Sequence, residues 1–65
     1  MDGQELTEAC IGLRYEKASE LCKENGFIYR VESTDGVYHM VTSDIRTDRV
    51  TFCVDDDIIS YARIK

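Results

Sequence analysis

The chain has 65 residues, which suffice for one domain and leave no length for a second. A domain of this size buries only about 60% of the surface of its unfolded chain, so the small core favours binding at a surface over catalysis in a large internal cleft. With 8 basic against 13 acidic residues, the formal net charge of −5 repels phosphate backbones and excludes nucleic acid as an expected partner.

Hydropathy and cysteine usage indicate the compartment. No apolar run approaches the roughly 20 residues that span a bilayer, and the N-terminal stretch is acidic where a signal peptide is basic. We therefore expect a cytoplasmic protein that does not bind a membrane. The odd number of cysteines makes neither a disulfide framework nor a CxxC metal motif, so we expect Cys10, Cys22 and Cys53 to be reduced and mostly buried. A disulfide bond between Cys10 and Cys53 remains an alternative.

The first half of the chain predicts one helix. Residues 1–8 are acidic and polar, and we expect a segment that can stay flexible, with at most a short turn before Cys10. Helical spacing then appears in the apolar side chains of Tyr15, Ala18, Leu21 and Cys22. This pattern predicts a helix over residues 15–25, which Gly26 ends in the place where a left-handed residue usually closes a helix.

Two strands and a tight turn are predicted next. Residues 27–31 are β-branched and aromatic, which is typical of a buried strand. Asp35–Gly36 is a strong hairpin signal, and residues 37–41 can return as a partner strand.

The C-terminal part predicts two further strands around an acidic turn. The alternation over residues 50–54 places Val50, Phe52 and Val54 on one face. Residues 55–57 predict a turn, and residues 58–64 predict a final strand. The order of elements predicts a single α+β domain over residues 1–65, with one helix packed on a small sheet.

A polar run, residues 41–48, separates the predicted strands and cannot be a core element. Asp44 and Arg49 lie on either side of its boundary with the following strand. An arginine fixed on that strand can hold a bowed loop through charge-assisted hydrogen bonds. A loop restrained in this way is suited to binding.

Several short motifs occur in the order of a known family. They are Ile11–Gly12 before the helix, Arg30–Val31 in a strand, Thr42–Asp44 in the loop, Asp48–Val50 after it, and then Val54–Asp55 and Ile58. Together they cover residues 9–64 and resemble the potato inhibitor I family and its bacterial I78 relatives. The resemblance implies a potato inhibitor I-like fold, in which one helix packs on a small mixed β-sheet and an extended binding loop joins two parallel strands.

The resemblance also implies a function. In those inhibitors the loop lies in a serine peptidase active site like a substrate, but its rigidity makes cleavage slow and readily reversed. Ser43 would then enter the specificity pocket, and Ser43–Asp44 would be the scissile bond. Thr42 and Asp44 would flank it and hydrogen-bond to Arg49. The implied binding residues are Thr42, Ser43, Asp44, Ile45, Arg46 and Arg49.

The sequence offers little for catalysis. His39 is the only histidine and lies in a predicted strand, where a packed or solvent-facing role is the usual one. The acidic residues 55–57 lack the glycine and distal glutamate of a calcium loop, so a solvated turn is expected. A glycine-rich phosphate loop is also missing. We therefore expect no enzyme, no metal site and no cofactor.

A different binding function stays open. Tyr29, Arg30, Tyr38 and His39 lie close in sequence, and a hairpin that brought them to one face would suit a small anionic ligand such as a signalling nucleotide. The alternative is thus a small phage-type cytosolic module that sequesters such a ligand or binds a host protein. A domain this small gains a pocket most easily between subunits, so this alternative implies a homo-oligomer. The basic residues can instead form ordinary surface ion pairs with neighbouring carboxylates.

Overall fold

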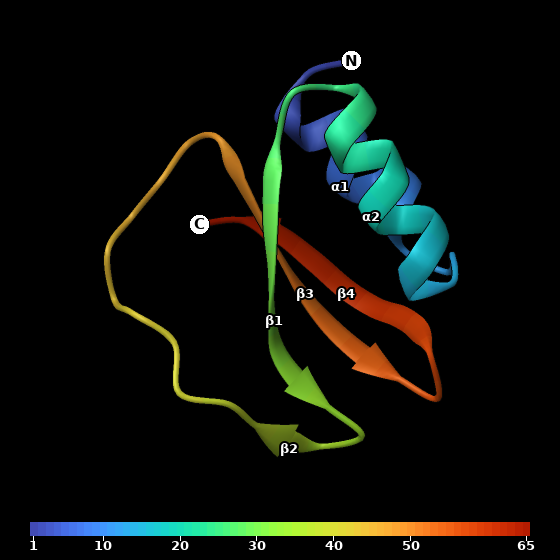
Figure 1. Cartoon of the computed structure of the whole chain (residues 1–65), viewed down its shortest axis with the longest axis vertical. Helices are drawn as coiled ribbons and strands as arrows, with labels where there is room; N and C mark the ends of the chain where they lie inside the picture. Colours follow the sequence, from blue (N-terminus) through green and yellow to red (C-terminus); the bar gives the residue numbers. More distant parts are fainter.

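Four strands form one mixed sheet in the computed structural model, which describes residues 1–65. The elements in chain order are α1 (Gly3–Cys10), α2 (Tyr15–Glu24), β1 (Ile28–Thr34), β2 (Val37–Tyr38), β3 (Arg49–Asp55) and β4 (Ile58–Ile64). The strand order is β2-β1-β3-β4, in which β1 and β3 run parallel and the two outer pairs are antiparallel. Both helices lie on one side of this sheet, and the segment between β2 and β3 bows out on the other (Figure 1). The α+β class is therefore confirmed, with two helices where one was predicted.

The additional helix, α1, occupies most of the segment that the sequence left as flexible. Asp2 caps it, because its carboxylate accepts a hydrogen bond of 2.8 Å from the backbone N–H of Glu5. Leu6 and Cys10 are four residues apart, so they lie on one helical face, and both are fully buried. The prediction of at most a short turn there is wrong, because this face packs into the core.

The second helix agrees with the prediction. It begins at Tyr15, buries Ala18 and Cys22, and is followed by Gly26 at a positive φ of 76°. Glycine tolerates this left-handed conformation without a steric penalty, so it ends the helix as expected. Neither helix has the length and the apolar character that crossing a membrane would require.

The hairpin between β1 and β2 forms at the predicted turn but is shorter than expected. Asp35 and Gly36 have φ of 51° and 83°, the positive values that a tight two-residue turn needs. Strand β2 then ends at Tyr38, and only the backbone N–H of His39 still bonds to β1, at 2.8 Å from the Glu32 carbonyl. The predicted strand over residues 37–41 is therefore wrong beyond Tyr38, because the chain turns away into the loop.

The two faces of β3 have different surroundings. Val50, Phe52 and Val54 belong to the core cluster that also contains residues of both helices, as their alternation predicted. Thr51 lies on the opposite face, next to Arg30 of β1 and Arg63 of β4 in the strand register. The sheet thus has an apolar face under the helices and a polar face away from them.

Candidate functional site

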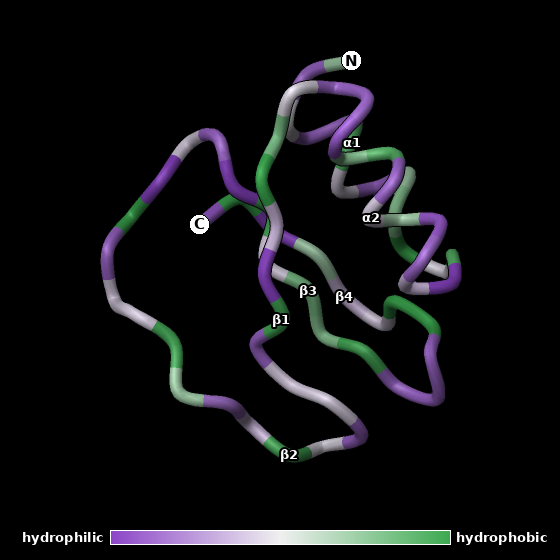
Figure 2. The backbone as a smooth tube through the Cα atoms, in the orientation of Figure 1, coloured by the Kyte–Doolittle hydropathy of each residue, from purple (hydrophilic) through white to green (hydrophobic).

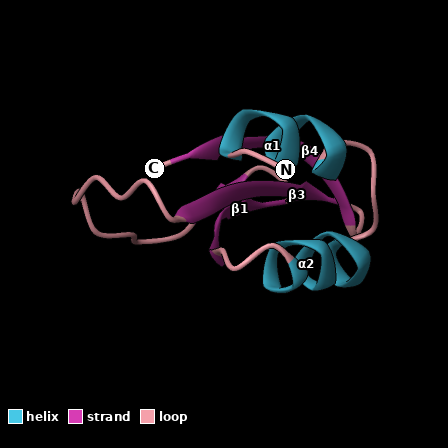
Figure 3. Ribbon diagram, turned by 90° about the horizontal axis from the view of Figure 1, so that it is seen from above, coloured by secondary structure: helices cyan, strands magenta, loops and turns pink.

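The longest segment outside the helices and strands is the loop of residues 39–48, between β2 and β3. It contains no helix or strand, and every residue from Thr42 to Asp48 is exposed. Seen from above, the loop projects from the side of the molecule that lies away from both helices (Figure 3). Its conformation therefore depends on polar contacts with the sheet rather than on the apolar core.

Arg49, the first residue of β3, ties the loop at Asp44. Although charged, Arg49 is only 8% exposed. Its Nη2 donates to the backbone carbonyl of Asp44 at 3.0 Å, and its Nη1 lies 3.4 Å from the Asp44 carboxylate. The same Nη2 also donates to the Lys65 carbonyl at 2.7 Å. One guanidinium thus joins the loop to the end of β4, and the predicted contact between Arg49 and Asp44 is present.

A second arginine, Arg30 of β1, ties the loop at Thr42. Its Nη1 donates to the Thr42 carbonyl at 3.1 Å and to the Thr42 hydroxyl at 3.0 Å. Its Nε donates to the hydroxyl of Thr51 at 3.2 Å, which fixes the guanidinium against the neighbouring strand. The expected hydrogen bond between Thr42 and Arg49 is therefore absent, because Arg30 binds Thr42 instead.

The Arg30–Thr42 and Arg49–Asp44 contacts are also linked to each other. The Thr42 hydroxyl donates a hydrogen bond to the Asp44 carboxylate. That hydrogen bond, together with the guanidinium of Arg49, holds the pKa of Asp44 below its usual range. Ser43, between the two tied residues, remains exposed. A cavity of about 280 Å³ lies beneath this stretch and is lined by residues 41–45, Arg30 and Lys65.

Further along the loop, Arg46 and Asp48 form a two-pronged ion pair. Both hydrogen bonds, from Nε and Nη2 of Arg46 to the two carboxylate oxygens, measure 2.8 Å. The hydrogen bond from Arg46 lowers the pKa of Asp48. Because both side chains are about half exposed, water screens this pair strongly. The pair of Arg46 with Asp48 is therefore a weak local restraint within the loop.

The residues of the alternative ligand site do not gather. The ring of Tyr29 lies on the core face, with its centroid 6.0 Å from that of Phe52, whereas Arg30 points from the opposite face. Tyr38 is 73% exposed on β2. His39 Nε2 lies 2.8 Å from the Thr34 hydroxyl and borders a different cavity from the one that Arg30 lines.

On the polar face, the remaining basic residues are paired with Glu32. Arg63 and Lys65 lie 3.3 Å and 3.0 Å from its carboxylate. The hydrogen bond from Lys65, with a smaller contribution from Arg63, lowers the pKa of Glu32. Ion pairs with nearby carboxylates were the competing explanation for the basic residues around the loop. The structure contains such pairs for Arg46 and Arg49, but Arg30 bonds to Thr42 and Thr51 instead.

All three cysteines are free. Cys10 and Cys22 are neighbours in the core, and burial, followed by the proximity of Cys10, raises the pKa of Cys22 to about 12. Cys53 lies on the other face of β3, so no bridge joins it to Cys10. No group of three or more His, Cys, Asp or Glu side chains is arranged to hold a metal ion.

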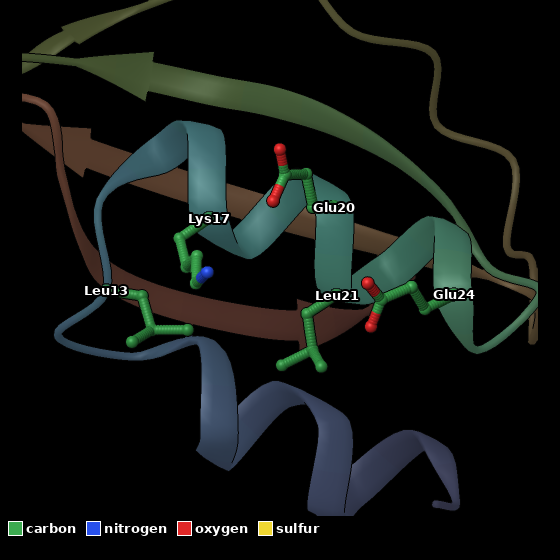
Figure 4. Close-up of a pocket in the computed structure, with 5 residues that line it drawn as sticks. All are labelled: Leu13, Lys17, Glu20, Leu21 and Glu24. Atoms are coloured by element: carbon green, nitrogen blue, oxygen red, sulfur yellow. The ribbon is translucent and has the colours of Figure 1, made fainter.

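A smaller cavity, of about 170 Å³, lies along α2 on the helix side. Figure 4 shows Leu13 and Leu21 pointing into the space between α2 and α1. Its other lining residues are Lys17, Glu20 and Glu24. Glu20 points away from the leucines, whereas Lys17 and Glu24 lie on the same side of α2 as Leu13 and Leu21 (Figure 4). None of the predicted site residues lines this cavity.

Comparison of the chain with protein-family models, curated proteins and solved structures finds no match. The resemblance to the potato inhibitor I family therefore stays a prediction. What the structure adds to it is a pair of arginines from adjacent strands that hold the two neighbours of Ser43.

Proposed function

We propose that the protein is a serine peptidase inhibitor-like binding protein that acts through a substrate-like loop over Thr42–Arg49. The observation that supports this most is the separate tie on each side of Ser43. Arg30 binds Thr42 and Arg49 binds Asp44, so an exposed peptide is held from both ends by strands of the same sheet. On this proposal the protein works in the cytoplasm, by binding and without catalysis.

Such a loop would resist turnover by a peptidase for two physical reasons. An already ordered loop loses little conformational entropy on binding, which favours a long-lived complex. If the Ser43–Asp44 bond were cut, the new ends would stay attached to β1 and β3 through different arginines. The freed amine would remain beside the acyl group, and proximity would favour re-formation of the bond over release.

The direct test is titration of the purified protein into subtilisin with a chromogenic substrate. We expect stoichiometric inhibition, stronger inhibition by Ser43→Tyr because a ring fills an apolar specificity pocket, and weaker inhibition by Arg49→Ala because the loop loosens. Equal absence of binding in the wild type and both variants would refute the proposal. Size-exclusion chromatography with light scattering on the same sample reports whether the protein is monomeric.

The alternative, a phage-type homo-oligomeric module for a small anionic ligand or a host protein, has less support. Tyr29 and Arg30 lie on opposite faces of the sheet, and His39 borders a different cavity. A thermal-shift screen with nucleotides tests the ligand form of it, and a stabilised oligomer that leaves subtilisin uninhibited would favour it.

A further inference from the structure

Two large apolar side chains of the loop are strongly exposed, and a small polar one lies between them in the sequence. Met40 is fully exposed at 102%, and Ile45 is 87% exposed. Ser43 lies between them and is also exposed. Figure 2 shows two hydrophobic stretches of the chain along the loop, separated by a paler and then a hydrophilic one.

The other side chains between Met40 and Ile45 are hydrogen-bonded within the chain or partly buried. Thr42 and Asp44 are turned towards the sheet by their hydrogen bonds to Arg30 and Arg49. Val41 is half-buried. A protein that grips the loop around Ser43 would therefore meet Met40 on one side and Ile45 on the other.

The sizes of these side chains decide which contact is strong. The hydroxymethyl group of Ser43 has almost no apolar area to bury, so a deep specificity pocket would stay largely empty around it. Met40 and Ile45 each bring a full apolar side chain, and burying one raises affinity by about tenfold to a hundredfold. Arg46, the one side chain of this stretch suited to a deep acidic pocket, is held by Asp48.

On the basis of the proposed function, we propose that the partner is a serine peptidase with a shallow primary specificity pocket, flanked by apolar subsites that receive Met40 and Ile45. Ser43 fits the shallow pocket without anchoring the complex. Met40 and Ile45 are the affinity-determining residues, and Arg30 and Arg49 hold them in position.

The experiment measures inhibition constants against serine peptidases of four kinds. They are an elastase with a shallow pocket, subtilisin with a broad apolar cleft, chymotrypsin with a deep apolar pocket and trypsin with a deep acidic one. Met40→Ala and Ile45→Ala are compared with Ile11→Ala, which removes an isoleucine that is 43% exposed at the end of α1, on the helix side. We expect the elastase to be inhibited most strongly, with each loop variant weaker by about tenfold to a hundredfold and Ile11→Ala unchanged.

The outcomes separate this inference from the function on which it rests. Inhibition that persists at wild-type strength in Met40→Ala and Ile45→Ala would overturn the inference and leave the inhibitory function intact. Selective inhibition of trypsin would do the same, because Arg46 would then be the primary residue. If none of the four peptidases is inhibited, the proposed function fails and the inference fails with it.

Discussion

The two sides of β3 are held to their neighbours by different forces. On the helix side, Phe52 is fully buried and packs against the rings of Tyr15 and Tyr29, at centroid distances of 6.2 Å and 6.0 Å. On the loop side, Arg49 and Arg30 hold the chain almost entirely by hydrogen bonds to Asp44 and Thr42. Apolar packing does not depend on charge, whereas the loop contacts need ionised groups. The loop can therefore lose its order while the fold persists, whereas loss of the fold removes the loop as well.

The largest effect is expected from breaking the apolar side. Phe52→Ala removes the central ring of the core and should lower the free energy of unfolding by about 3–5 kcal/mol. A domain this small has little stability in reserve, so much of the sample should be unfolded and the loop should be lost with the sheet. Urea denaturation followed by circular dichroism measures the change. A shift of less than about 1 kcal/mol would show that the core is not organised around this ring.

An intermediate effect is expected from breaking the loop side alone. Arg30→Ala removes both hydrogen bonds to Thr42, while the core residues remain in place. The rate at which subtilisin cuts the loop should rise by at least about tenfold, the factor that corresponds to the loss of a single charge-assisted hydrogen bond, with little change in the denaturation midpoint.

The matched rescue moves the guanidinium to the neighbouring strand. Arg30 and Thr51 are paired in the register, so Arg30→Ala combined with Thr51→Arg places an arginine beside the vacated position. We expect the double variant to regain at least part of the protection against cleavage. Arg46→Ala, which breaks only an exposed pair, serves as a control and should leave the denaturation midpoint unchanged. A double variant cut as fast as Arg30→Ala would show that Arg30 does not act through Thr42.

The smallest effect is expected from a change of pH. It also distinguishes the loop contacts from the apolar core most clearly. The folded pKa of Asp44 lies below its unfolded value of about 3.9, so its stabilising contribution is fully present above that value. The contribution is lost as pH falls through the lowered folded pKa. Acid should therefore loosen the loop before the core, which contains no carboxylate.

Amide chemical shifts of residues 42–45, followed between about pH 6 and about pH 2, measure this loosening against residues 50–54. Asn at position 44 keeps the shape of the side chain and removes the titrating group. The Asp44→Asn variant should therefore show a much smaller acid-dependent change at residues 42–45, and what remains should come from the pair of Asp48 with Arg46. Simultaneous loss of both sets of signals would mean that the loop and the core are not independent.

Local patterns in the sequence predict the elements that such patterns determine. The helix at Tyr15 and the tight turn at Asp35–Gly36 follow from spacing and from the need for positive φ. Helix α1 was missed because eight residues are too few to be helical alone. Its sequence signals are the capping residue Asp2 and the apolar pair Leu6 and Cys10. They stabilise a helix only when the apolar side of α1 packs against β4.

In the candidate site, too, only the contact between residues close in sequence could be predicted. The contact between Arg49 and Asp44 spans five residues and could be anticipated from their positions beside the loop. The contact between Arg30 and Thr42 depends on the parallel pairing of β1 with β3, a long-range register that no local pattern specifies. Without that register, Arg30 was assigned to a ligand site with Tyr29. Strand alternation argues against this assignment, because neighbouring residues on a strand point to opposite faces.

Because its contacts come from two different strands, the loop cannot keep its conformation as an isolated peptide. A synthetic peptide of residues 39–49 would contain Arg49, but it would lack Arg30 and the carbonyl of Lys65 to which Arg49 also binds. Cyclising such a peptide would restore its curvature without restoring either partner. A minimal mimic therefore has to include β1, β3 and the end of β4, which is most of the sheet, so the whole domain is the smallest practical scaffold for displaying other sequences at Ser43.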